Sequence, residues 1–284
     1  MEPTNQKHVV LVATDFSPTG DNAIVFAENL ARQFHGKIVL LHVLDNKSQK
    51  RLQKQRKDIG WLEEKLKEEA VRVNAISGVE TSWLLRRGSI IKTIADVAGE
   101  TGALFMVAGT HGKKGIQFLS GSFILKLIKR APVPAFAIQK AVENTDFKDI
   151  IYPLDTTPGS TQKVKWAVQL NKLMGSRFHI FAENPGLESY RLKLRGDLNL
   201  VTRIMEQNGV GFTVTHAGKK GSFAGQVVDF AKDKHAGLIM VSTDPGKITW
   251  AISGSSDEKL IYNMEKIPVM CINSKDVSVI VGGL

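Results

Sequence analysis

Cysteine is nearly absent from this chain. Its 284 residues include one cysteine, Cys271, which excludes an internal disulfide and a Cys-x-x-Cys pair for a metal or redox centre. Cys271 stands within the apolar run Val-Met-Cys-Ile, which predicts a buried, inert thiol. Such sparse cysteine is typical of proteins kept in a reducing compartment, and we therefore expect a cytoplasmic location.

Long apolar stretches are missing as well. No run in the sequence approaches the ~20 apolar residues that a membrane-spanning helix needs. The first seven residues, Met-Glu-Pro-Thr-Asn-Gln-Lys, contain no apolar core of the kind that signal peptides carry. The sequence therefore predicts neither export nor association with a membrane.

Several catalytic signatures are also missing. The sequence has no Walker loop of the type Gly-x-x-x-x-Gly-Lys-Ser/Thr and no metal-ligand cluster of its own. It offers no nucleophile, base and orienting group that can be placed within mutual reach. We therefore do not expect an enzyme, and any chemistry should be slow.

Positive charge is concentrated in the first half of the chain. The formal net charge is +10, and residues 1–140 hold 21 Lys and Arg against 13 Asp and Glu, whereas residues 141–284 hold 17 against 15. This excess favours an anionic ligand in the first half, although solubility alone could account for it. The basic run from Lys47 to Lys57 is most simply a solvated helix face, so a nucleic-acid partner is not expected.

One stretch in the first half has the pattern of a phosphate-binding loop. Leu104–Ala108 is a short apolar run, as expected of a strand buried on both faces of a parallel sheet. Gly109 and Gly112 follow it, and glycine lets a backbone approach a ligand closely. Gly121 and Ser122 then begin an apolar helix, whose free N–H groups attract anions. Glycines after a strand can also serve only a tight turn, so the pattern needs support from elsewhere in the chain.

A second stretch supplies that support. Residues 8–13, His-Val-Val-Leu-Val-Ala, form another apolar run, and Thr-Asp-Phe-Ser-Pro follows it at positions 14–18. Asp15 is thereby placed at the carboxyl edge of the same predicted sheet, where open α/β sheets bind ligands. Asp15 has the alternative role of a turn residue or helix cap.

The sequence repeats itself. Arg86–Ile90 recurs as Lys219–Phe223 at an offset of 133, and Gly121-Ser122 recurs as Gly254-Ser255 at the same offset. Nearer the N-terminus of each half, Asp-Phe-Ser-Pro at positions 15–18 corresponds to Asp-Thr-Thr-Pro at positions 155–158. Two homologous α/β domains are predicted, 1–140 and 141–284, each an open five-stranded, mainly parallel sheet flanked by helices.

These motifs resemble the universal stress protein family, the UspA-like branch of the adenine nucleotide α-hydrolase-like folds. ATP-binding members carry an Asp after the first strand and, after the fourth, a Gly, two residues, Gly, nine residues and Gly-Ser/Thr. Asp15, Gly109, Gly112, Gly121 and Ser122 match this pattern, with eight residues instead of nine between the second and third glycines. The resemblance implies an ATP-binding regulator of the stress response.

The resemblance also implies roles for individual residues. Asp15 and the backbone near His42 and Val43 would border the adenine and ribose. The phosphates would be enclosed by Gly109, Gly112, Gly121 and Ser122, and His111 would contact their oxygens. A divalent ion such as Mg²⁺ or Mn²⁺ could bridge the phosphates. A nucleotide-independent interaction module and a slow ATP-hydrolysing or adenylating enzyme are the alternative functions.

In the second half the matching loop is altered. Ser242 and Pro245 stand where the first half has Gly109 and Gly112, and proline removes an N–H that a phosphate needs. Asp244 adds a negative charge where a polyphosphate would lie. We therefore expect the first domain to bind nucleotide and the second to bind little or none.

Three further expectations concern structure and assembly. The periodicity of Ile59, Leu62, Leu66 and Ala70 predicts one helix over about 48–73, and a helical segment over 187–207 should break at Gly196. The strand over 134–138 should pair with 269–272, as in the family. Self-association is expected through that fifth strand or through the β-prone C-terminal tail.

Overall fold

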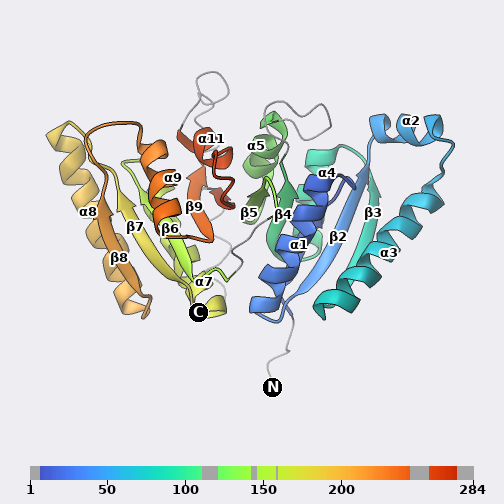
Figure 1. Ribbon diagram of the computed structural model, residues 1–284, viewed down its shortest axis with the longest axis horizontal. Coiled ribbons are helices and arrows are strands. Elements are labelled where there is room, and N and C mark those ends of the chain that lie inside the picture. Colours follow the sequence, from blue (N-terminus) through green and yellow to red (C-terminus); the bar gives the residue numbers. More distant parts are fainter. Residues whose placement is uncertain (1–6, 111–120, 142–145, 158, 244–255, 274–284) are drawn as a thin grey trace. The chain divides into compact units, whose positions relative to one another are not determined.

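The chain forms two compact α/β units. The computed structural model describes residues 7–110, 121–141, 146–157, 159–243 and 256–273 (Figure 1). The units span Met1–Ala141 and Val142–Leu284. In the part of the chain that the structure describes, no helix is long and apolar enough to cross a membrane.

The first unit is built on a parallel sheet. Its strands are β1 (Val9–Ala13), β2 (Lys37–Leu44), β3 (Thr81–Arg87), β4 (Ala103–Gly109) and β5 (Ala135–Ile138), and its helices are α1 (Pro18–Gln33), α2 (Asn46–Lys54), α3 (Ile59–Ser77), α4 (Ile90–Glu100) and α5 (Gly121–Arg130). The strands lie in the order β3-β2-β1-β4-β5, and every neighbouring pair is parallel. Strand order reverses between β1 and β4, which is where open α/β sheets bind ligands.

The reversal places helices on both faces of this sheet. Right-handed crossovers put the helices that follow β1 and β2 on one face and those that follow β3 and β4 on the other. Accordingly α1 packs against α3, and α4 packs against α5. Figure 1 shows α1 and α3 in front of the sheet. The central strands are covered on both sides, which is why β1 and β4 are almost wholly apolar.

The long helix predicted over 48–73 is wrong, because the segment forms two helices. Asp45 begins α2 with a capping box, in which its carboxylate accepts from the Ser48 N–H at 2.8 Å. Arg56 then takes the left-handed conformation, with φ of 53°. Asp58 starts α3 by accepting from the Trp61 N–H at 2.9 Å. The apolar periodicity correctly predicted α3. The capping hydrogen bonds of Asp45 and Asp58 separate α3 from the helix before it.

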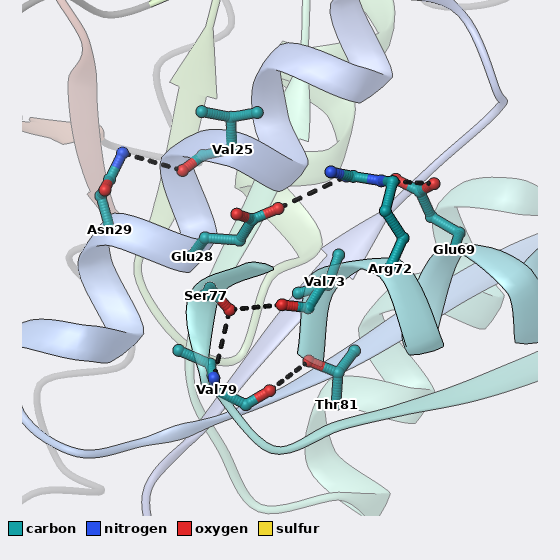
Figure 2. Close-up of polar contacts among 9 residues, drawn as sticks. All are labelled: Val25, Glu28, Asn29, Glu69, Arg72, Val73, Ser77, Val79 and Thr81. Atoms are coloured by element: carbon teal, nitrogen blue, oxygen red, sulfur yellow. Dashed lines mark hydrogen bonds and ion pairs between the residues drawn. The ribbon is translucent and has the colours of Figure 1, made fainter. Parts of the chain in front are cut away.

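A charged network ties α3 to α1 (Figure 2). The Arg72 guanidinium lies 2.7 Å from a carboxylate oxygen of Glu69 and 3.4 Å from one of Glu28 on α1. Burial raises the pKa of Glu28, and the Arg72 charge opposes that rise. At the end of α3, the Ser77 hydroxyl accepts from the Val79 N–H and closes the turn into β3.

The second unit repeats this architecture. Its strands are β6 (Asp149–Leu154), β7 (Arg177–Ala182), β8 (Phe212–His216), β9 (Leu238–Thr243) and β10 (Val269–Asn273), and its helices are α6 (Gly159–Gln162), α7 (Val164–Met174), α8 (Glu188–Gln207), α9 (Phe223–Asp233) and α11 (Ser256–Ile261). The order is β10-β9-β6-β7-β8, again with parallel neighbours. The predicted fold class, two open-sheet α/β domains in tandem, is confirmed.

The break expected at Gly196 is wrong. Helix α8 continues without interruption from Glu188 to Gln207. A glycine inside a helix costs only about 1 kcal/mol relative to alanine. Leu194, Val201 and Met205 bury one face of α8, and this packing outweighs the local preference of the glycine.

A polar cluster joins three strands at the amino end of the second sheet. The Asp149 carboxylate accepts hydrogen bonds from Arg177 Nε at 2.5 Å and from His179 Nε2 at 2.7 Å. His179 Nδ1 lies 2.8 Å from the Thr213 hydroxyl on β8. The hydrogen bond from Arg177 is the main cause that lowers the pKa of Asp149 below its usual 3.8, with His179 adding to it and partial burial opposing it.

This cluster predicts a stability that depends on acidity. A carboxylate with a lowered folded pKa stabilises the fold above its unfolded pKa, and that contribution is lost as pH falls through the folded pKa. Asp149→Asn should therefore reduce stability at pH 7 by up to about 1 kcal/mol, since its partner Arg177 is largely exposed and solvent screens the pair. Urea unfolding at pH 7 and pH 3 measures this. The difference from wild type should shrink at pH 3, and an equal difference at both values would contradict the assignment.

Candidate functional site

The turn after β1 holds Asp15 in a fixed position. One oxygen of the Asp15 carboxylate accepts from the Ser17 N–H at 3.0 Å, which is an Asx turn. Ser17, not Asp15, caps α1, because its hydroxyl accepts from the Gly20 N–H at 3.2 Å. Asp15 therefore does act as a turn residue, and it does so through Oδ1. Its other oxygen, Oδ2, makes no hydrogen bond to a described residue.

His42 on β2 is hydrogen-bonded to this turn. Its Nδ1 lies 2.8 Å from the Thr14 carbonyl oxygen, so this nitrogen carries the proton and donates. Burial lowers the pKa of His42, against the opposing effect of the bond to Thr14 and of nearby carboxylates. The imidazole is therefore neutral at physiological pH, which leaves Nε2 without a proton.

An aromatic side chain covers the histidine. The Phe16 ring stacks on the His42 ring, with the two centroids 4.9 Å apart. Phe16 has a φ of 57°, a left-handed conformation that is costly for a bulky residue. The Lys65 ammonium lies 4.5 Å from the Phe16 ring centroid, which is a cation–π contact.

A cavity of about 200 Å³ opens at this edge of the sheet. It is bordered by Asp15, His42 and Val43, the three residues that the sequence assigned to the base and sugar. Typical sites for a whole small ligand have about 300–1,000 Å³, so this cavity matches only one part of a nucleotide, such as the base. The structure thus brings these three residues to one hollow.

The opposite wall of the cavity comes from residues that the sequence did not single out. Helix α2 and the residue after it contribute Ser48, Arg51, Leu52 and Gln55, while α3 and α4 contribute apolar side chains and Trp61. The prediction of one long helix missed this wall. The break near Arg56 separates α2 from α3, so that each helix contributes its own side chains to the cavity. The Asp-x-x-Ser pattern from position 45 was the signal that could have placed the start of α2.

Gly109 at the end of β4 has a packing role of its own. A Cβ at this position would lie 2.4 Å from the Thr19 carbonyl oxygen and 3.1 Å from the Gly20 nitrogen. A Cβ on Gly20 would in turn lie 3.1 Å from the Asp15 carboxylate. The end of β4, the first turn of α1 and Asp15 are therefore in close contact, so the two predicted halves of the site meet.

The remaining predicted residues lie at or beyond the limits of the described chain. His111 and Gly112 are outside the described residues. Gly121 and Ser122 form the first turn of α5, as expected, and only their backbone is described. Among the described residues, no group of three or more His, Cys, Asp or Glu side chains could hold a metal ion.

The same edge of the second unit has different chemistry. Ala13 pairs with Leu41 in the first sheet and Pro153 pairs with Phe181 in the second, so Glu183 occupies the place of Val43. Burial raises the pKa of Glu183, and the nearby Asp155 charge raises it further.

Buried side chains fill the space beneath that edge. Lys163 donates to the Pro153 carbonyl at 2.5 Å, and its ammonium lies 4.5 Å from the ring of the buried Tyr152. Ser242 ends up in β9, whereas Asp244, Pro245, Gly254 and Ser255 lie outside the described residues. Carboxylates would repel a polyphosphate here, which supports a difference between the two units.

Comparison with known proteins agrees with this fold. Residues 7–139 match the model of the universal stress protein family. This match covers nearly all of the first unit, which is therefore a universal stress protein domain. No curated protein sequence matches the chain at a significant level.

Solved structures match nearly the whole chain. A universal stress protein from Archaeoglobus fulgidus DSM 4304 is 18% identical with a TM-score of 0.75, over 95% of this chain and 99% of that chain. A protein of unknown function from Pseudomonas aeruginosa PAO1 is 13% identical with a TM-score of 0.58, over 95% and 94%. Both similarities show a shared fold across both units.

The close packing at Gly109 predicts a large effect of a small substitution. Gly109→Ala should lower the stability of the first unit by about 1–3 kcal/mol, because the new methyl group overlaps the Thr19 carbonyl. Thermal unfolding measures this loss. Ser242→Ala is the matched control in the second unit and should change stability little, because a Cβ is already present there. A Gly109→Ala protein that melts like wild type would contradict this packing role.

Proposed function

We propose that the first unit binds ATP at the carboxyl edge of its sheet and that the protein is a nucleotide-dependent regulator of the stress response. The observation that carries this proposal is the cavity bordered by Asp15, His42 and Val43. The match of residues 7–139 to the universal stress protein family model supports it. The first turn of α5 offers N–H groups to phosphates, as helix N-termini do.

The arrangement fits the parts of a nucleotide. The cavity would take the adenine, and Oδ2 of Asp15 would accept a hydrogen bond from a ribose hydroxyl. The triphosphate would extend past Gly109 toward α5, where Gly112, Gly121 and Ser122 would enclose it and His111 would contact its oxygens. Mg²⁺ or Mn²⁺ would reach this site, if at all, through the phosphates, since the described residues supply no metal cluster.

We propose binding without efficient catalysis. His42 is the imidazole at the cavity, and its Nδ1 is held by the Thr14 carbonyl. Within the described residues, His42 makes no hydrogen bond to a hydroxyl or thiol, which a catalytic pair requires. Slow ATP hydrolysis remains the enzymatic alternative, and a nucleotide-independent interaction module is the other.

Location and assembly complete the proposal. The protein would act in the cytoplasm, where ATP is available and Cys271 stays reduced. Self-association would use the fifth strand or the C-terminal tail. The pairing of residues 134–138 with 269–272 stays a prediction.

Calorimetric titration with ATP tests the binding site. Wild type should bind one nucleotide per chain. Asp15→Asn should weaken binding at least about tenfold, since a hydrogen bond to a charged group contributes about 1.5–3 kcal/mol. Asp155→Asn is the matched control in the second unit and should leave the affinity unchanged.

Four results would overturn parts of this proposal. Two sites per chain, or a loss of affinity in Asp155→Asn, would show that the second unit binds nucleotide as well. Absence of binding in wild type would favour the interaction module. Repeated turnover of ATP to ADP would favour the enzyme.

A further inference from the structure

A buried hydroxyl without a partner lies beside the proposed phosphate site. Thr110 follows Gly109 at the end of β4, and its N–H donates to the Ile138 carbonyl on β5 at 2.7 Å. The residue is only 1% exposed. Its Oγ1 is sealed from solvent and makes no hydrogen bond to any residue that the structure describes.

Such a hydroxyl is costly for the unliganded protein. A buried donor or acceptor left unpaired loses its hydration without compensation, typically by about 1–3 kcal/mol. Buried polar groups are therefore almost always paired, and an exception calls for a functional explanation. Strand β4 otherwise ends in apolar residues and a glycine, so nothing in its own packing requires a hydroxyl here.

The direction of the side chain can be derived from its neighbour. The Cβ direction of Gly109 points at Thr19 in the first turn of α1. Successive residues of an extended chain point to opposite faces of the sheet. Thr110 therefore points to the other face, which α4 and α5 cover. That is the face on which α5 begins, and the first turn of a helix has backbone N–H groups with no partner inside the helix.

The second unit provides an internal comparison. Thr243 is the repeat equivalent of Thr110, at the same offset of 133 that relates the other repeated segments. Its Oγ1 donates to the Ile272 carbonyl at 3.4 Å. The same residue type at the same strand position is thus paired in the unit with the altered edge and unpaired in the unit with the cavity.

We propose that Thr110 Oγ1 donates a hydrogen bond to a phosphate oxygen of the nucleotide bound by the first unit. This inference rests on the proposed function and adds a phosphate ligand that the glycine pattern does not include. Thr110 and the first turn of α5 would hold the phosphate from two sides. The ligand then satisfies the hydroxyl that the free protein leaves unpaired.

A substitution of the same shape separates this role from a structural one. Thr110→Val replaces the hydroxyl with a methyl group, so without nucleotide its melting temperature should equal or exceed that of wild type. Its affinity for ATP should fall at least about tenfold in calorimetric titration. Thr110→Ser keeps the hydroxyl and should retain most of the affinity. Thr243→Val is the matched control, which should bind ATP like wild type and melt no higher than it does.

Each result is decisive. Wild-type affinity in Thr110→Val overturns the inference, because a phosphate ligand cannot be lost without effect. A lower melting temperature of unliganded Thr110→Val also overturns it, because the hydroxyl would then have an internal partner. If wild type binds no ATP, the proposed function fails first, and the melting comparison still tests whether Thr110 is unpaired.

Discussion

The first unit depends on how closely the start of α1 approaches the end of β4. Gly109 leaves no room for a side chain against the Thr19 carbonyl, and Gly20 leaves little room against the Asp15 carboxylate. This contact joins the strands on either side of the point where strand order reverses. Asp15 is fixed by the same turn, since Ser17 caps α1 and donates its own N–H to the Asp15 carboxylate. The position of the candidate site therefore follows from backbone packing.

Polar and aromatic side chains then shape the edge of the sheet. His42 donates to the Thr14 carbonyl, and Phe16 covers the imidazole in a conformation that is unfavourable for the backbone. Such strain persists only where the surroundings hold it, and it is common at ligand sites. Helix α2 completes the cavity from the other side. The result is a hollow bounded by apolar walls and a few polar groups, as small-molecule sites generally are.

The two units show how one scaffold can carry two different edges. Both sheets have the same strand order, and β1 pairs with β2 in the same register as β6 with β7, so the ends of these strands are equivalent positions. In the first unit this edge is a cavity, whereas the second places Glu183 there and buries Lys163 against Tyr152. The two threonines differ in the same way, because Thr243 is paired and Thr110 is not. The second unit therefore keeps the fold while its carboxyl edge carries different side chains.

The sequence by itself determined the fold class, the repeat and the residues at the carboxyl edge. Buried parallel strands read as continuous apolar runs, and turn residues such as Asp15 and Gly109 mark where those strands end. Local patterns did not predict the break near Arg56, which results from capping hydrogen bonds. Nor did they predict that α8 continues through Gly196, which results from burial of one face of that helix. Only the tertiary structure showed that α2 walls the cavity, that Thr19 demands a glycine at position 109 and that Thr110 is buried unpaired. These facts depend on contacts between segments far apart in the chain, which no local pattern encodes.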